Sequence, residues 1–210
     1  GDEGLIEAFR ENQDIHRSTA SKVFGVAFDD VTDLQRRNAK AVNFRIVYGI
    51  SAFGLSQDLN IPQKEAQGFI DSYFATYPKI KEFLDQTVAQ AKECGFTRTL
   101  FGRIRPIPEL SSSNFMQRQF GERVAMNAPI QGTAADIIKI AMIRVHDRLI
   151  REGYKSRLIL QVHDELLIET AESEKDAVIA LLEEEMRQAA DLKVELAVGT
   201  ECGYDWYDAH

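Results

Sequence analysis

The chain has 210 residues, enough to bury a core, and it combines 44% hydrophobic residues with a formal net charge of -8. No apolar run approaches the roughly 18 to 20 residues that a membrane-spanning helix needs, so no membrane partner is expected. Cys94 and Cys202 form no CxxC pair. The sequence therefore predicts neither a zinc site nor a disulfide framework, and a reducing, cytoplasmic setting is expected.

The charge is unevenly distributed along the chain. The acidic balance argues mildly against a nucleic-acid binder, because phosphate affinity normally comes from a basic surface. Acidic residues dominate positions 165–208. Basic residues gather earlier, at Arg36, Arg37, Lys40, Arg45, Arg98, Arg103, Arg105, Arg118 and Arg123. The sequence is thus compatible with a local basic groove on an acidic body.

The first half of the chain is predicted to be helical. Thr32-Asp-Leu-Gln35 is a capping box that opens a helix running to about Tyr48, where Gly49 stops it. Pro62 and Pro78 each lie where the first turn of a later helix begins. Two further boundaries are a break near Asp14-Ile-His16 within residues 4–28 and a helix end at Gly95.

After Phe96 the pattern changes to mixed structure. Residues 97–108 predict a short hairpin or an extended loop. A helix from Met116 is expected to end before Pro129, and another begins after Thr133 with its apolar residues at core spacing. The remainder predicts strands at 158–162 and 166–169, a helix from Ser173 to about Ala190, and a strand at 194–198. The expected fold class is α+β, with helices in front and a small antiparallel sheet behind.

One stripe of the helix over residues 33–48 carries chemically useful side chains. Arg36, Lys40, Phe44 and Tyr48 follow one another at four-residue steps over about 18 Å, a span that suits a nucleoside triphosphate. The basic end lies at the helix N-terminus, which favours phosphate, and the aromatic end offers a flat surface to a base or sugar. The alternative is a solvated basic turn followed by core aromatics.

A second candidate site is Gln161-Val-His-Asp-Glu165. A two-residue hairpin turn favours glycine or asparagine, yet here the turn is His163-Asp164, so a carboxylate at a strained tip indicates function. Such a carboxylate suits Mg²⁺. The alternative is an ordinary polar tip. A hydrolase is disfavoured, because the sequence has neither the paired histidines of a zincin nor a nucleophile elbow.

Together with Gln131-Gly132-Thr133, these features point to nucleotidyl transfer on a template, and they carry a family resemblance. Arg36 to Phe44, continued by Tyr48-Gly49, resembles motif B of family A DNA polymerases of the bacterial DNA polymerase I type. Gln161 to Glu165 resembles their motif C. Further matching segments are Thr99-Leu-Phe-Gly-Arg103, Asn127 to Asp136 and Trp206 to His210. The resemblance covers essentially the whole chain.

The resemblance implies a helical fingers subdomain at 1–95 and the C-terminal part of the palm at 96–210, with a catalytic hairpin at 157–169. It implies transfer of a nucleotide from dNTP to the 3′-hydroxyl of a DNA primer-template with two Mg²⁺ ions. Asp164 would be a metal ligand, Glu165 an auxiliary carboxylate, and His163 would lie near the primer terminus. Nucleotide contacts would come from Arg36, Lys40, Phe44, Tyr48 and His16, and DNA contacts from Arg123, Asn127, Gln131, Arg98 and Arg103.

The chain departs from the family pattern in three respects. Arg45 stands where the family normally has glycine, and Ile104 where it commonly has a basic residue. No motif A aspartate is present, so a second carboxylate is expected from outside the chain, together with the thumb, in cis or on a partner chain. The start without Met suggests a fragment, inactive alone. The alternative function is a non-catalytic primer-template or nucleotide-binding module; a single-subunit RNA polymerase is disfavoured by motif C.

Overall fold

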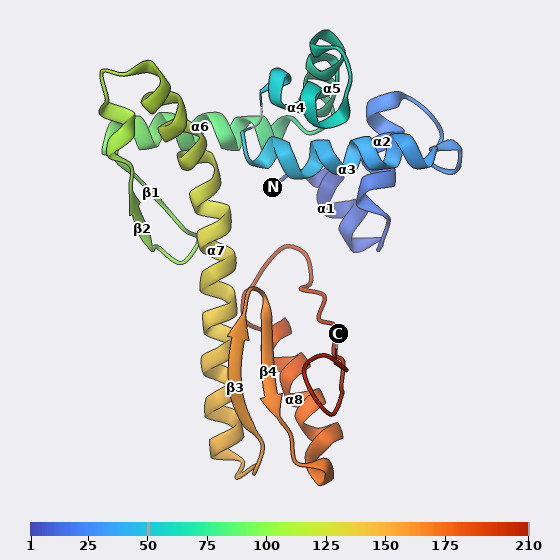
Figure 1. Ribbon diagram of the computed structural model, residues 1–210, viewed down its shortest axis with the longest axis vertical. Coiled ribbons are helices and arrows are strands. Elements are labelled where there is room, and N and C mark those ends of the chain that lie inside the picture. Colours follow the sequence, from blue (N-terminus) through green and yellow to red (C-terminus); the bar gives the residue numbers. More distant parts are fainter. Residues whose placement is uncertain (50, 210) are drawn as a thin grey trace. The chain divides into compact units, whose positions relative to one another are not determined.

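The computed structural model describes residues 1–49 and 51–209, and the chain forms two compact units, residues 1–131 and 132–210. The division falls within the long helix α7 (Phe115–Arg151). Figure 1 shows that most elements are helices, and the described residues also form two antiparallel two-stranded sheets. The predicted α+β class is confirmed, with two small sheets in place of one.

The described part of unit 1 begins with six α-helices. The predicted break between the first two is confirmed, because Asp14 caps a new helix there, and the capping box of Thr32 and Gln35 starts α3 as expected. The bounds are α1 (Glu3–Arg10), α2 (Ile15–Phe24), the 3-10 turn η1 (Phe28–Asp30), α3 (Asp33–Val47), α4 (Ala52–Leu59), α5 (Gln63–Thr76) and α6 (Pro78–Cys94). Pro62 is the N-cap of α5 and Gly95 the left-handed C-cap of α6.

The core of unit 1 lies beneath α3. Val42 and Ile46 on the inner face of α3 pack in one cluster with Leu55 of α4 and Tyr73 of α5. Leu55 is fully buried, and a leucine side chain in such a place contributes about 1.5 to 3 kcal/mol. The inner face of α3 is therefore fixed by packing, which determines which of its side chains point outward.

A hairpin follows α6, as predicted. Strand β1 (Phe96–Arg98) pairs antiparallel with β2 (Ile104–Pro106), and the turn η2 (Pro108–Ser111) comes next. The tip closes through a hydrogen bond from the Thr99 N–H to the Arg103 carbonyl at 2.9 Å. The predicted subdomain boundary between residues 95 and 96 lies just after α6, whereas the two compact units divide between residues 131 and 132.

The predicted interruption at Pro129 is wrong. Helix α7 continues through this residue. Proline cannot donate to the carbonyl of Ala125 and costs roughly 3 kcal/mol inside a helix. The helix persists because its other backbone bonds continue on both sides and because Ala125 and Ala128 are buried against unit 1. Local propensity is overruled here by packing.

Unit 2 contains the C-terminal part of α7 and the second hairpin. Strand β3 (Arg157–Val162) pairs with β4 (Glu165–Glu169), and η3 (Glu172–Glu174) leads into α8 (Lys175–Arg187). In Figure 1 the two strands run side by side with α8 next to them. The core is formed by apolar residues from α7, β4, α8 and the following segment: Ile138, Ala141, Val145, Leu149, Leu166, Val178, Leu181 and Ala189.

The strand predicted at residues 194–198 is wrong, because this segment is not paired with any described strand. Its side chains nevertheless alternate: Val194, Leu196 and Val198 are partly buried while Glu195 and Ala197 are exposed. The alternation that the sequence displays is thus real, but a strand also requires a hydrogen-bonding neighbour. The alternation of hydrophobic residues therefore indicates that one side of the segment is buried, and not that the segment is a strand.

Candidate functional site

The predicted stripe of α3 faces away from the core of unit 1. Phe44 is 53% exposed and Tyr48, the C-cap residue, is 44% exposed, while Lys40 is also exposed. Core aromatics, the alternative left open by the sequence, are therefore contradicted. Because the inner face already holds Val42 and Ile46, the aromatic residues of the stripe are available to a ligand.

Asp14 braces the basic end of the stripe. Its Oδ1 accepts hydrogen bonds from the N–H groups of His16 and Arg17, which caps α2, and its Oδ2 lies 2.6 Å from Arg36 Nε. Burial raises the pKa of Asp14, but the Arg17 N–H and the Arg36 guanidinium outweigh it and hold the pKa below its usual value of 3.8. The carboxylate is thus charged and orients Arg36.

His16 lies beside the same stripe, as predicted. Its ring centroid is 5.7 Å from that of Phe44, and its Nδ1 is 3.1 Å from Asn43 Nδ2. Burial lowers the pKa of His16, Asp14 raises it, and Arg36 and Lys40 lower it, with a net lowering from 6.5. The imidazole is therefore neutral at pH 7 and carries one N–H donor.

Gly49 brings the aromatic end of the stripe against α7. A β-carbon on Gly49 would lie 2.9 Å from Met126 Sδ and 3.3 Å from Arg123 Cγ, and its φ is +66°. Only glycine satisfies both the close approach and this backbone conformation without strain. The sequence predicts Gly49 as a helix stop, but its contact with Arg123 is not evident from the sequence.

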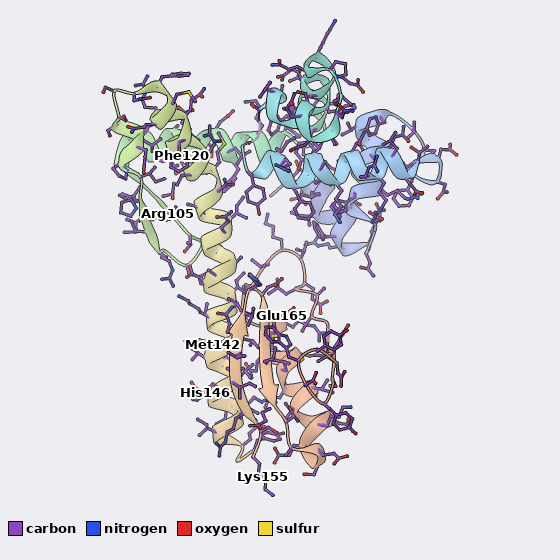
Figure 2. The ribbon with its side chains drawn as sticks, viewed as in Figure 1. Arg105, Phe120, Met142, His146, Lys155 and Glu165 are labelled. Atoms are coloured by element: carbon purple, nitrogen blue, oxygen red, sulfur yellow. The ribbon has the colours of Figure 1, made fainter. Side chains whose placement is uncertain are left out.

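The predicted DNA-contacting residues all lie in unit 1. Arg123, Asn127 and Gln131 follow one another at four-residue steps on α7, and Asn127 Oδ1 is buried without a hydrogen-bond partner among the described residues. Arg98 and Arg103 are exposed on the β1–β2 hairpin. In Figure 2 the hairpin also carries Arg105, and Phe120 lies near the start of α7. The β1–β2 hairpin thus carries three arginines.

The second candidate site is the turn between β3 and β4 in unit 2. His163 has φ +51°, whereas Asp164 is not in the left-handed region. The turn thus has the unfavourable backbone conformation expected of its tip, and it falls on His163, the residue before Asp164. Gln161 Nε2 donates to the His163 carbonyl at 2.7 Å and braces the turn. Figure 2 places Glu165 at the turn end of the hairpin.

The turn offers two adjacent carboxylates to a metal ion. Asp164 is exposed and Glu165 partly buried, so Asp164 is open to a ligand. Carboxylate oxygens are donors that Mg²⁺ accepts, and the pair fits as part of its shell. Among the described residues no group of three or more His, Cys, Asp or Glu is arranged to hold a metal.

No helix in the same residues is long and apolar enough to cross a membrane.

Comparison with known proteins gives a consistent result. The model of DNA polymerase family A matches residues 1–208. The chain belongs to DNA polymerase family A. It is 54% identical to DNA polymerase I of Caldicellulosiruptor bescii over 207 residues and 52% identical to that of Geobacillus stearothermophilus over 208, covering 99% of this chain and 24% of each relative. The chain spans about a quarter of the length of these family A polymerases.

A solved structure of the family has the same fold. It is the POL domain of Pol1 from M. smegmatis in complex with DNA primer-template and dNTP, and it matches with a TM-score of 0.93 and 45% sequence identity. The match covers 99% of this chain and 37% of that chain. The predicted membership of family A is confirmed.

Arg45, the departure from the family pattern, has a partner. Its guanidinium Nη1 lies 3.0 Å from Asp58 Oδ2 of α4, with 52% and 34% of the two side chains exposed. The ion pair joins the arginine to the neighbouring helix. An exposed pair of this kind contributes at most about 1 kcal/mol.

Three residues that contact side chains of the site are not identified by sequence patterns: Asp14, Asn43 and Asp58. Asp14 shows one signal, because it precedes the first turn of α2 and aspartate is a favoured N-cap. Its pairing with Arg36 joins residues 22 positions apart. No periodicity within a single helix predicts such a contact.

Proposed function

We propose that this chain supplies the nucleotide-binding helix and one catalytic carboxylate of a template-directed DNA polymerase. The observation that carries the proposal is the outward stripe of α3, with Arg36 and Lys40 at the basic end and exposed Phe44 and Tyr48 at the aromatic end. The polymerase named Pol1 from M. smegmatis, of the same fold, is described in complex with DNA primer-template and dNTP. That complex supports the same ligands here.

The residues of α3 act on the incoming nucleotide. Arg36 and Lys40 bind the phosphate chain, with a donor from His16 beside them, and Phe44 packs on the sugar and base. Tyr48 lies at the templating end. In the reaction the primer 3′-hydroxyl loses its proton to solvent, its oxygen bonds to the α-phosphorus of the dNTP, and pyrophosphate leaves with the electrons of the broken P–O bond.

The turn of the β3–β4 hairpin acts on the reacting groups. Asp164 would hold Mg²⁺ with Glu165 beside it, and bound ions would supply stabilisation of the charge that develops on the transferred phosphoryl group. His163 orients the primer terminus. The basic residues of α7 and of the β1–β2 hairpin hold the DNA backbone: Arg123, Asn127, Gln131, Arg98 and Arg103.

The second carboxylate is proposed to come from outside these residues. A two-metal site needs carboxylates that bridge both ions, and no further His, Cys, Asp or Glu completes a metal group in the described part of unit 2. The same finding favours the alternative, a module that binds primer-template or nucleotide without chemistry. We further assign residues 1–95 to the fingers and 96–210 to the palm of a bacterial cytoplasmic enzyme.

Primer extension separates the two functions. The measurement compares the 210-residue chain with a chimera in which it replaces the matching 208 residues of the G. stearothermophilus polymerase. We expect extension by the chimera and none by the chain alone. Asp164→Asn should reduce extension by the chimera at least a hundredfold while DNA affinity persists, because charge stabilisation in the transition state is lost.

The matched control is Asp147→Asn, which neutralises another exposed aspartate of unit 2. It should extend at the rate of the unchanged chimera. Near-normal extension by Asp164→Asn in Mg²⁺ would contradict the catalytic assignment. A chimera that binds primer-template but never extends it would support the non-catalytic module.

A further inference from the structure

A hydrogen-bonded chain lies behind the nucleotide-facing stripe of α3. Asn43 Nδ2 donates to His16 Nδ1 and to Thr19 Oγ1, each at 3.1 Å. The Thr19 hydroxyl lies 3.2 Å from the Tyr77 hydroxyl. Thr19 and Tyr77 are both fully buried, so this end of the chain is held by the core of unit 1. Asn43 thus connects the core to the imidazole of His16.

The orientation of the Asn43 amide follows from counting donors and acceptors. As oriented, both N–H groups of Nδ2 have partners, and only Oδ1 is buried without one among the described residues. The reversed amide would place Oδ1 against His16 and Thr19 and leave two N–H donors buried without partners. Because an unpaired buried donor is costly, the observed orientation is favoured.

This orientation selects one tautomer of His16. A neutral imidazole carries a single N–H, so Nδ1 can accept from Asn43 only if the proton is on Nε2. Protonation of the ring would place an N–H of Nδ1 against the amide N–H of Asn43. Burial lowers the pKa of His16, as do Arg36 and Lys40, against the opposing effect of Asp14, which also favours the neutral ring.

We propose that Asn43 is a positioning residue, which holds the neutral His16 ring with its proton on Nε2 so that this N–H donates to a nucleotide phosphate beside Arg36 and Lys40. The identity of the ligand rests on the proposed function. Arg36 and Lys40 supply charge, which attracts phosphate from a wide range of directions. The Nε2–H group supplies direction, because its position is fixed through Asn43 by Thr19 and Tyr77.

Nitrogen NMR of the imidazole rings in the 210-residue chain tests the positioning role without any nucleotide. The four histidines are few enough to resolve, and His16→Gln identifies the signal of His16. We expect the Nε2–H tautomer in the unchanged chain. Asn43→Asp replaces the amide donor by a carboxylate acceptor, so the proton should move to Nδ1 and the ring should titrate at a pH about 1 to 3 higher.

The matched control is Asn38→Asp, which makes the same charge change on α3 at a residue with no hydrogen bond to His16 in the described structure. It should leave the Nε2–H tautomer in place. Finding the neutral ring protonated on Nδ1 in the unchanged chain would overturn the inference. So would an Nε2–H tautomer that persists in folded Asn43→Asp. If that variant does not fold, the spectrum of the unchanged chain decides.

Titration with dATP and Mg²⁺ then separates this inference from the proposed function. At a pH above that at which the variant's His16 ring titrates, Asn43→Asp should weaken binding roughly tenfold, because the neutral ring then lacks the N–H facing the phosphate. An unchanged chain with the Nε2–H tautomer but no affinity for dATP would contradict the proposed function and leave the positioning role standing. Binding of dATP by a chain whose His16 is the Nδ1–H tautomer would support the proposed function and contradict the positioning role of Asn43.

Discussion

The stripe on α3 and the turn between β3 and β4 differ in how firmly their side chains are held. On unit 1, Arg36 is paired with Asp14, His16 with Asn43, and Arg45 with Asp58. On unit 2, the backbone of the turn is braced by Gln161, but Asp164 itself has no hydrogen bond or ion pair within the described residues.

The difference shows two ways of building a site for charged ligands. The groups of unit 1 are oriented before a ligand arrives, so less ordering is needed on binding. The carboxylate of Asp164 is exposed, so a ligand would have to orient it on binding. Removing one braced group should therefore reduce activity by degrees, whereas removing Asp164 should abolish it, as the Asp164→Asn chimera would show.

Lys40→Ala should have the largest effect among changes to the braced site. In the chimera we expect kcat/KM for dNTP to fall roughly ten- to a hundredfold, with both KM and kcat affected, because an ammonium in the proposed role would bind both the phosphate and its developing charge. Steady-state kinetics against dNTP measure it, with Lys64→Ala on α5 as control. A variant that loses only DNA affinity would make α3 a DNA contact instead.

Asp14→Asn tests the brace itself. Asparagine keeps the N-cap oxygen of α2 but removes the negative charge that pairs with Arg36. We therefore expect a fall in kcat/KM of roughly three- to tenfold with nearly unchanged folding. The pKa of Asp14 is lowered, so its contribution to stability is complete above pH 3.8 and is lost as the pH falls through the folded-state value.

Acid unfolding should therefore be less pH-dependent in Asp14→Asn than in the unchanged chain. Glu93→Gln, which neutralises another exposed carboxylate of unit 1 on α6, is the control. Equal activity of Asp14→Asn and the unchanged chimera would show that Arg36 needs no brace.

Arg45→Gly restores the residue that the family normally has. We expect the free energy of unfolding of unit 1 to fall by about 1 kcal/mol, mainly from helix propensity, with a smaller part from the exposed pair with Asp58. Asp58→Asn removes the ion pair alone, so it should lower the free energy of unfolding by less than Arg45→Gly does. The effect of Asp58→Asn should fade in high salt, whereas the loss of helix propensity in Arg45→Gly should not. Urea unfolding at two salt concentrations measures both. A salt-independent effect of Asp58→Asn would contradict an electrostatic role for the pair.

His163→Gly should have the smallest effect, and its sign is opposite. The left-handed φ of His163 strains a histidine but not a glycine, so we expect a gain in stability of roughly 0.5 to 1 kcal/mol. Thermal unfolding of the 210-residue chain measures it, and His163→Ala should not share the gain. If the strain serves the reaction, the chimera with His163→Gly should nevertheless turn over more slowly. Loss of stability would show that the histidine side chain holds the turn.

Much of this fold follows from signals within a few residues. The capping box of Thr32 and Gln35 and the two-residue turn at His163-Asp164 are readable because their hydrogen bonds join near neighbours. The stripe of α3 is likewise readable, but its exposure is not, since it depends on what covers the helix. The sequence left core aromatics open, and the structure shows Phe44 and Tyr48 exposed.

The errors arise where distant parts of the chain decide. Pro129 predicts a break, yet buried alanines around it keep α7 continuous. The alternation at residues 194–198 predicts a strand, but a strand needs a neighbour that local pattern does not reveal. The pairs Asp14 with Arg36 and Asn43 with His16 also join separate helices. These contacts are properties of the tertiary structure.

The close approach at Gly49 has a genetic consequence. Every single-base change that turns a glycine codon into that of another amino acid introduces a β-carbon, here 2.9 Å from Met126 Sδ, in a backbone conformation with φ +66° that such residues disfavour. A smaller residue at Met126 would remove the contact with Sδ but neither the 3.3 Å approach to Arg123 Cγ nor the unfavourable φ. Every single substitution of Gly49 is therefore expected to destabilise the chain, and a double change with Met126 should remain less stable than the chain with glycine.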